Sequence, residues 1–150
     1  SSAGPNISYL GSGVCKTKPK DELSVRLVSI LEQLREVLSS FDVQSGAIEK
    51  TFVKSDPAGA LKLGQARAAA IISLGERNLK VAEYSPNYIK KVVVGRGHAT
   101  KEDIKKMISI QFPRIELDRA DESDAIAIAL CHMHSSKMKD SLNRAIERAI

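Results

Sequence analysis

The sequence predicts a three-layer α/β fold, because short strand-like segments alternate with longer segments of helical periodicity along its 150 residues. Hydrophobic residues make up 43% of the chain and charged residues 27%, a balance typical of one globular domain with its own core. The sequence contains no internal repeat and no low-complexity segment. We therefore expect one domain over residues 1–136 and a C-terminal tail over residues 137–150 that is loosely helical.

The N-terminal part of the chain predicts a strand and then a helix. Residues 8–17 (SYLGSGVCKT) favour a short strand in which two glycines mark a bend. Asp21 or Ser24 is a candidate cap for a helix that runs to about Ser40. Apolar residues at helical spacing predict this helix: Leu23, Leu27, Ile30, Leu31, Leu34, Val37, Leu38 and Phe41.

The middle of the chain repeats the same alternation. Residues 46–52 (GAIEKTF) predict a second strand, and Pro57 begins a helix that runs to about Arg77. The many small residues in this helix suit close packing against a neighbour. Residues 81–84 predict a brief strand, and residues 87–94 predict a short helix or an extended run.

Two more helices are predicted in the C-terminal part. Residues 100–111 have the period of an amphipathic helix, and a strongly apolar helix runs from Asp121 to about Ser135. The side chains expected to point inward from the first of these are Ile104, Met107, Ile108 and Phe112.

Three acidic residues at the margins of apolar segments are the strongest functional signal. Glu49 lies in the second predicted strand, and Asp121 and Asp124 open the apolar helix at a spacing that puts them on one helix face. A carboxylate near a core is costly unless it is paired or binds a metal. The alternatives are that the two aspartates cap the helix, and that Glu49 forms an ion pair with Lys50 or Arg67.

Two histidines and one aromatic residue also need an interpretation. His132 and His134 are two residues apart, so a helix points them to different sides, and we expect helix-face residues rather than a metal pair. Phe52 is most simply a core residue, but at the exit of the strand that contains Glu49 it could also stack on a base.

The net charge of +5 fits an anionic partner, and most of it comes from one segment. Residues 90–106 contain six basic and two acidic residues, and a glycine-containing loop, Gly95-Arg96-Gly97-His98, divides them. A solvated helix face would explain the lysines equally well, but it explains the loop less well. The basic residues of this segment are Lys90, Lys91, Arg96, Lys101, Lys105 and Lys106.

The two cysteines and the lack of a long apolar run bear on the compartment. Cys15 and Cys131 have neither the spacing of a zinc site nor that of a disulfide framework, so we expect buried thiols in a reducing compartment. No apolar run approaches membrane-spanning length, and residues 1–6 do not form a signal peptide. We expect a cytoplasmic protein.

Several motifs taken in order resemble the RuvC family of bacterial Holliday-junction resolvases. They are YLGSG at Tyr9, AIEKTF around Glu49, ALKLGQAR over residues 60–67, AEYSPNYIKKVVVGRGHATK over residues 82–101 and DESDAIAIALCHMH over residues 121–134. The resemblance implies an RNase H-like fold with a central mixed sheet between helices. It also implies a homodimeric endonuclease that nicks two strands of a four-way DNA junction, as a partner of the RuvA-RuvB branch-migration complex.

The same resemblance assigns roles to individual residues. Glu49, Asp121 and Asp124 match three of the family's four catalytic acids, which bind two Mg²⁺ ions that Mn²⁺ can replace. Phe52 matches the aromatic residue that stacks at the junction, and Lys90 and Lys101 match basic residues at the cleft. The expected nucleic-acid contacts are Phe52, Lys90, Lys91, Arg96 and Lys101.

One departure from the family affects the expected activity. The fourth acid lies in an N-terminal strand with a G-[IL]-D-P-G motif, which does not occur in this sequence. We therefore expect the first strand of the sheet to be missing, as in a fragment of a resolvase; the alternative is a degenerate copy that binds junctions without cutting them. Another RNase H-like nuclease that acts on RNA is a further alternative. Glu122, between the two aspartates, either adds a metal ligand or faces solvent.

Overall fold

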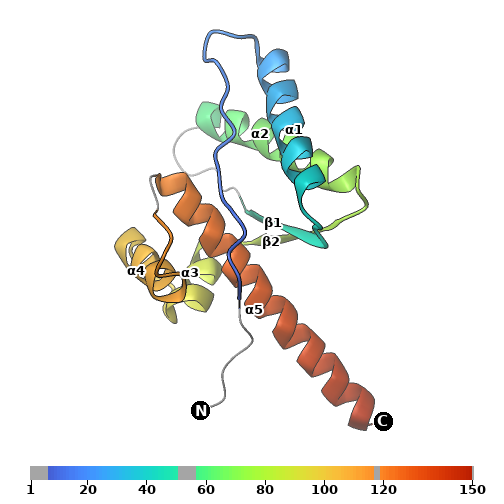
Figure 1. Ribbon diagram of the computed structural model, residues 1–150, viewed down its shortest axis with the longest axis vertical. Coiled ribbons are helices and arrows are strands. Elements are labelled where there is room, and N and C mark those ends of the chain that lie inside the picture. Colours follow the sequence, from blue (N-terminus) through green and yellow to red (C-terminus); the bar gives the residue numbers. More distant parts are fainter. Residues whose placement is uncertain (1–6, 51–56, 117–118, 150) are drawn as a thin grey trace.

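The computed structural model describes residues 7–50, 57–116 and 119–149, with side chains described as far as Met138. Within these ranges, no helix is long and apolar enough to cross a membrane. The elements follow one another as α1 (Leu23–Ser40), β1 (Ser45–Glu49), α2 (Pro57–Gly75), β2 (Lys80–Tyr84), α3 (Pro86–Val94), α4 (Lys101–Gln111) and α5 (Ala120–Ala149) (Figure 1).

The described strands β1 and β2 form a parallel pair whose register runs from Ser45 opposite Lys80 to Glu49 opposite Tyr84. A parallel pair needs a crossover connection, and here α2 provides it. Helices α1 and α2 pack together on one side of the strands, and α5 passes along the other side (Figure 1). This arrangement confirms the predicted layers of helix, sheet and helix.

Side chains of β1 alternate between the two helical layers, as the pleat of a strand requires. Gly46 faces α2, because a Cβ atom at this position would collide with the Leu74 side chain. Ser45 faces α5, where its Oγ lies 2.8 Å from Nε2 of His132. Glu49, four residues after Ser45, therefore points toward α5 as well.

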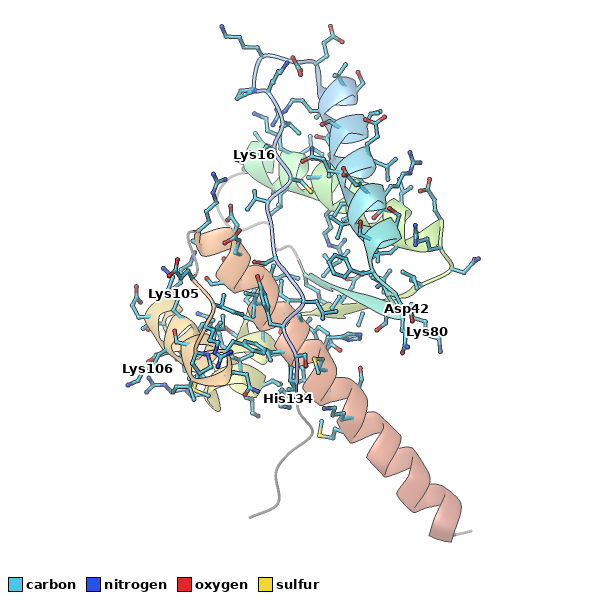
Figure 2. All side chains as sticks on the ribbon, viewed as in Figure 1. Lys16, Asp42, Lys80, Lys105, Lys106 and His134 are labelled. Atoms are coloured by element: carbon cyan, nitrogen blue, oxygen red, sulfur yellow. The ribbon has the colours of Figure 1, made fainter. Side chains whose placement is uncertain are left out.

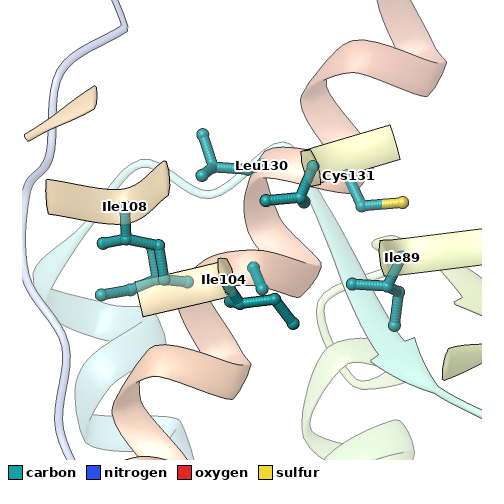
Figure 3. Packing of buried hydrophobic residues seen from close by; sticks show 8 residues of the cluster. Ile89, Ile104, Ile108, Leu130 and Cys131 are labelled. Carbon is teal, nitrogen blue, oxygen red and sulfur yellow. The ribbon is translucent and has the colours of Figure 1, made fainter. Parts of the chain in front are cut away.

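The main hydrophobic core lies where α3 and α4 pack against α5 (Figure 3). Helix α4 begins with a capping box, in which the Thr100 hydroxyl accepts from the Asp103 amide and the Asp103 carboxylate accepts from the Thr100 amide. Ile108 from α4 and Cys131 from α5 have no exposed surface. The other buried members of this core are Ile89, Val93, Ile104, Ile126, Ala127 and Leu130.

The prediction of a strand over residues 8–17 was wrong, since residues 7–17 have no regular secondary structure. The Lys16 backbone pairs with a side chain instead of a neighbouring strand. The Lys16 amide donates to Gln33 Oε1 at 3.0 Å, and Gln33 Nε2 donates to the Lys16 carbonyl at 2.9 Å. Tyr9 packs against Phe112, with ring centroids 6.0 Å apart.

The predicted start of α1 and the predicted end of α5 were also wrong. Glu22, and neither Asp21 nor Ser24, occupies the N-cap position of α1, and its side chain makes no capping hydrogen bond. Helix α5 continues without a break from Ala120 to Ala149 instead of ending near Ser135. Because no helix ends near residue 136, the domain boundary expected there stays a prediction.

Three further predictions are settled by packing and local geometry. Met107 was expected to point inward but is 36% exposed, while its neighbours Ile104 and Ile108 are buried. Residues 87–94 form a helix, not an extended run, because the Ser85 hydroxyl accepts from the Tyr88 amide and Pro86 occupies the first turn. Both cysteines are free thiols, Cys131 fully buried and Cys15 half-buried, and burial raises the pKa of each.

Candidate active site

Two carboxylates and two lysines line one cavity of about 280 Å³ where the sheet meets α5. Glu49 comes from the end of β1 and Asp124 from the second turn of α5, while Lys90 comes from α3 and Lys101 from the first turn of α4. Apolar residues of the core complete the lining: Pro86, Ile89, Ile104, Ala127 and Ile128. Four elements that are distant in sequence thus bring opposite charges to one place.

Local structure explains how each charged group reaches the cavity. Glu49 is on the α5 side of β1 because it shares the strand face of Ser45. Lys101 is the first residue of α4, so the Thr100 capping box fixes its backbone position. Lys90 lies one turn into α3, directly after Ile89, which anchors that helix in the core.

The carboxyl group of Glu49 has a raised pKa. Desolvation is the largest cause, and repulsion from Asp124 adds to it, whereas Lys101 and Lys90 oppose the shift. Both carboxylates also line the same cavity. Such a pair of oxygen ligands fits a divalent cation, which would relieve the repulsion and favour both ionised forms.

Lys101 is the cation closest to Asp124 in the described part of the chain. Its Nζ lies 3.7 Å from Asp124 Oδ2, and the two side chains are 66% and 45% exposed. An ion pair this exposed contributes little to stability, so the lysine can exchange this partner for another anion at low cost.

Asp121, the third predicted acid, is exposed in the first turn of α5 and does not line the cavity. Asp121 lies about 4.5 Å further along the helix axis than Asp124, toward the helix N-terminus. Across the described ranges, no group of three His, Cys, Asp or Glu side chains could hold a metal ion together. The geometry therefore joins Glu49 to Asp124 but does not add Asp121 to them. Glu122 is half-buried and lies outside the cavity lining.

Arg67 does not make the ion pair with Glu49 that was considered as an alternative. Its guanidinium pairs with Glu83 on β2 at 2.7 Å, and its Nε donates to the backbone carbonyl of Glu49 at 3.4 Å. Arg67 therefore holds the end of β1 from the α2 side and leaves the Glu49 carboxylate for the cavity.

The other predicted nucleic-acid contacts do not line the cavity or fall outside the described residues. Lys91 is exposed on α3, and Arg96 pairs with Asp103, the capping acid of α4, at 2.8 Å. Lys105 and Lys106 are exposed on α4 (Figure 2). Phe52 falls within residues 51–56, which are outside the described ranges.

Sequence reasoning missed the part played by His132. The expectation of a helix-face residue is met by His134, which is exposed (Figure 2), but His132 is half-buried between the strands and α5. Its Nε2 contacts the Ser45 hydroxyl at 2.8 Å, and its Nδ1 contacts the Tyr84 hydroxyl at 2.9 Å. These partners are 87 and 48 residues away along the chain, so no local pattern could reveal them.

Comparisons with known proteins identify the family of the chain. The family model described as crossover junction endodeoxyribonuclease RuvC matches residues 1–132. The crossover junction endodeoxyribonuclease RuvC of Cereibacter sphaeroides is 40% identical over 147 residues, which cover 98% of this chain and 87% of the relative. The protein of the same name from Ruegeria pomeroyi is 44% identical over 131 residues, which cover 87% of this chain and 79% of the relative.

Solved structures give the same likeness in three dimensions. The Thermus thermophilus RuvC structure matches with a TM-score of 0.78, and T. thermophilus RuvC in complex with Holliday junction substrate matches with a TM-score of 0.81. Each is 31% identical in sequence, and each match covers 87% of this chain and 79% of the other. This likeness confirms the predicted RNase H-like α/β fold.

Proposed function

The chain belongs to the RuvC family of crossover junction endodeoxyribonucleases, and from this premise we propose that the cavity between β1 and α5 hydrolyses phosphodiester bonds of four-way DNA junctions. The function is that of a structure-selective endodeoxyribonuclease that resolves Holliday junctions. The observation that carries the catalytic assignment is the convergence of Glu49 and Asp124 with Lys90 and Lys101 in one cavity.

We propose that Glu49 and Asp124 bind divalent metal ions, with Mg²⁺ as the natural ion and two ions per site. Support comes from the chemistry of the ligands, since carboxylate oxygens are what Mg²⁺ prefers, and from the desolvation and the repulsion by Asp124 that raise the Glu49 pKa in the protein alone. When bound, such ions supply a water that deprotonates near neutral pH and stabilise the leaving oxygen. Family resemblance supports Asp121, in the first turn of α5, as a further ligand.

The lysines are proposed to hold the phosphate. Lys101 and Lys90 face the carboxylates across the cavity, so a backbone phosphate that enters between them would gain two cationic contacts. Lys91 and Arg96 are proposed to contact the flanking phosphates, and Phe52 to stack on a base at the junction.

We further propose a homodimer, because a four-way junction has approximate two-fold symmetry and two identical sites would face two strands of like polarity. Support comes from α1 and α2, whose outer surfaces carry large hydrophobic side chains that the described chain leaves exposed. By family resemblance the dimer works with the RuvA-RuvB branch-migration complex in the bacterial cytoplasm.

The function is tested by Asp124→Asn in a nicking assay on a synthetic four-way junction. In a chain extended by the family's N-terminal strand, which supplies the fourth acid, we expect Mg²⁺-dependent nicking, none with EDTA, and a loss in Asp124→Asn that exceeds the roughly tenfold to hundredfold cost of disturbing an outer-shell residue. The chain without that acid should nick little or not at all, because one metal ligand is then missing. Junction binding, measured by fluorescence anisotropy, should stay within a factor of about two, because Asp124→Asn adds no repulsion toward phosphate.

Glu102→Gln is the matched control, since it makes the same charge change on the exposed side of α4, outside the cavity. It should nick at the native rate. Equal losses in Asp124→Asn and Glu102→Gln would assign the effect to net charge and contradict the site. Cutting of RNA in place of the junction would favour another RNase H-like activity.

A further inference from the structure

The His132 side chain on α5 forms hydrogen bonds to both strands of the sheet. Its Nε2 lies 2.8 Å from the Ser45 hydroxyl on β1, and its Nδ1 lies 2.9 Å from the Tyr84 hydroxyl on β2. The Tyr84 ring also lies against the imidazole, with centroids 5.9 Å apart. The imidazole therefore links α5 to both strands of the sheet.

The part of β1 and the part of α5 that lead from the His132 hydrogen bonds to the cavity have nearly the same length. From Ser45 to Glu49 the strand advances four residues, about 13 Å. From His132 back to Asp124 the helix covers eight residues, about 12 Å. Because β1 and α5 run in opposite directions here, fixing Ser45 to His132 at one end brings Glu49 beside Asp124 at the other.

We propose that His132 is a positioning residue that sets the register between β1 and α5, and thereby the separation of the Glu49 and Asp124 carboxylates. The inference rests on the proposed function of those two acids. His132 itself does not line the cavity and touches no reacting group.

The Tyr84 hydrogen bond strengthens the same register from the second strand. Tyr84 is the register partner of Glu49, and the Lys50 amide, directly after Glu49, donates to the Tyr84 carbonyl at 2.8 Å. Tyr84 also stacks on Tyr88 at 5.6 Å, and the Tyr88 hydroxyl lies 3.3 Å from Ser135 on α5. A shift of β2 relative to α5 would therefore be passed to the backbone next to Glu49.

Three substitutions at His132 separate the two hydrogen bonds. Phenylalanine keeps the ring but removes both bonds. The amide of glutamine reaches the position of Nε2, next to Ser45, and the amide of asparagine reaches that of Nδ1, next to Tyr84. In the extended chain with saturating junction DNA and Mg²⁺, we expect His132→Phe to lower kcat roughly tenfold to a hundredfold. His132→Gln should retain more activity than His132→Asn, because it keeps the bond to β1.

The positioning role predicts a pattern that a purely structural role of His132 would not give. KM and junction affinity should change less than about twofold in all three variants, since the phosphate-binding lysines are untouched. Ser45→Ala should lower kcat in the native background but not in the His132→Phe background. Ile108→Val, a core change away from the link, should leave kcat unchanged. A native kcat in His132→Phe, or an additive loss on combining the two changes, would overturn the proposal.

Hydrogen exchange of the Lys50 amide tests the positioning role of His132 without an activity assay. His132→Phe should speed this exchange at least tenfold, while the Phe112 amide, which donates to Ile108 at the end of α4, should exchange at the native rate. If the extended chain nicks no junctions, the proposed function fails, but exchange of the Lys50 amide still tests the register. Unchanged exchange at Lys50 would overturn the positioning role.

Discussion

At the scale of single residues, the candidate site carries a cost in stability. Glu49 has a raised pKa, first because its carboxyl group is partly desolvated and second because Asp124 repels its charge. A raised pKa means that the folded chain holds the Glu49 proton more tightly than the unfolded chain does. The folded state is therefore favoured at acid pH and loses this advantage as pH rises through the folded pKa.

We predict that Glu49→Gln makes the protein more stable than the native chain at neutral pH. The gain should disappear as pH falls below the ordinary glutamate pKa of 4.5, where native Glu49 is protonated in both states. Urea unfolding followed by circular dichroism at pH 7 and pH 4 measures the difference.

Glu76→Gln is the control with the opposite sign. Hydrogen bonds from Arg35 lower the Glu76 pKa, so this carboxylate favours the folded state when ionised, above the ordinary pKa, and stops doing so as pH falls through the lowered value. Glu76→Gln should therefore be the less stable protein at pH 7. If Glu49→Gln destabilises the protein at pH 7, the ionised Glu49 carboxylate does not lower the stability of the folded state.

At the scale of elements, the helices were largely predictable because their signals are local. The apolar period of 3.6 residues, the Thr100 cap and Pro86 in the first turn of α3 all lie within the helices that they specify. The strand predicted over residues 8–17 failed because a strand depends on a distant partner. Instead, the Gln33 side chain on α1 forms hydrogen bonds with the Lys16 backbone amide and carbonyl. No local pattern in the sequence predicts that contact.

The packing of β1 on α2 depends on Gly46, and this gives a second prediction. Gly46→Ala should lower the free energy of unfolding by roughly 1–3 kcal/mol, because its new methyl group would overlap the Leu74 side chain. Chemical denaturation measures the loss. The double variant Gly46→Ala/Leu74→Ala should lose less free energy of unfolding than the sum of the two single losses, because the shorter side chain at position 74 leaves room for the new methyl group.

Gly64→Ala on α2 provides the matched control. Nothing lies within 4 Å of a Cβ atom at this position, and alanine is the better helix former by roughly 0.8–1 kcal/mol. It should stabilise the protein. A neutral Gly46→Ala would mean that Leu74 moves aside freely and that β1 and α2 are loosely packed.

At the scale of the whole molecule, the order of the elements was readable from the sequence, but their convergence was only partly so. The sequence pointed to Glu49 and Asp124, and the structure brings both into one cavity. It also pointed to Asp121, which the structure leaves outside. The role of His132 had no sequence signal, because its partners are on two strands far away along the chain. Composition and periodicity describe neighbours in sequence, and a site is made of neighbours in space.

The proposed dimer gives a prediction at this scale. We expect light scattering coupled to gel filtration to give twice the mass of one chain. Val28→Asp on α1 and Leu63→Asp on α2 should each shift the protein toward the single chain, because a charge would then have to be buried. The exposed surface that this prediction concerns consists of Leu23, Val25, Val28, Val37, Leu61, Leu63 and Ile72.

Ile110→Asp is the control for the dimer, since Ile110 is 63% exposed on α4, on the other side of the molecule. It should leave the mass unchanged. A native protein that stays a single chain at high micromolar concentration would contradict the dimer and leave the α1–α2 surface for another partner.

The ion pair between Lys101 and Asp124 has a consequence for proton balance. The Lys101 ammonium group approaches Asp124, and together with Lys90 it opposes the rise in the pKa of Glu49. A phosphate that enters the cavity brings negative charge close to Glu49 and draws Lys101 toward itself. Both changes favour the protonated carboxyl, so phosphate binding in the absence of metal is accompanied by proton uptake. By linkage, affinity for the phosphate backbone then rises as pH falls through the titration of Glu49.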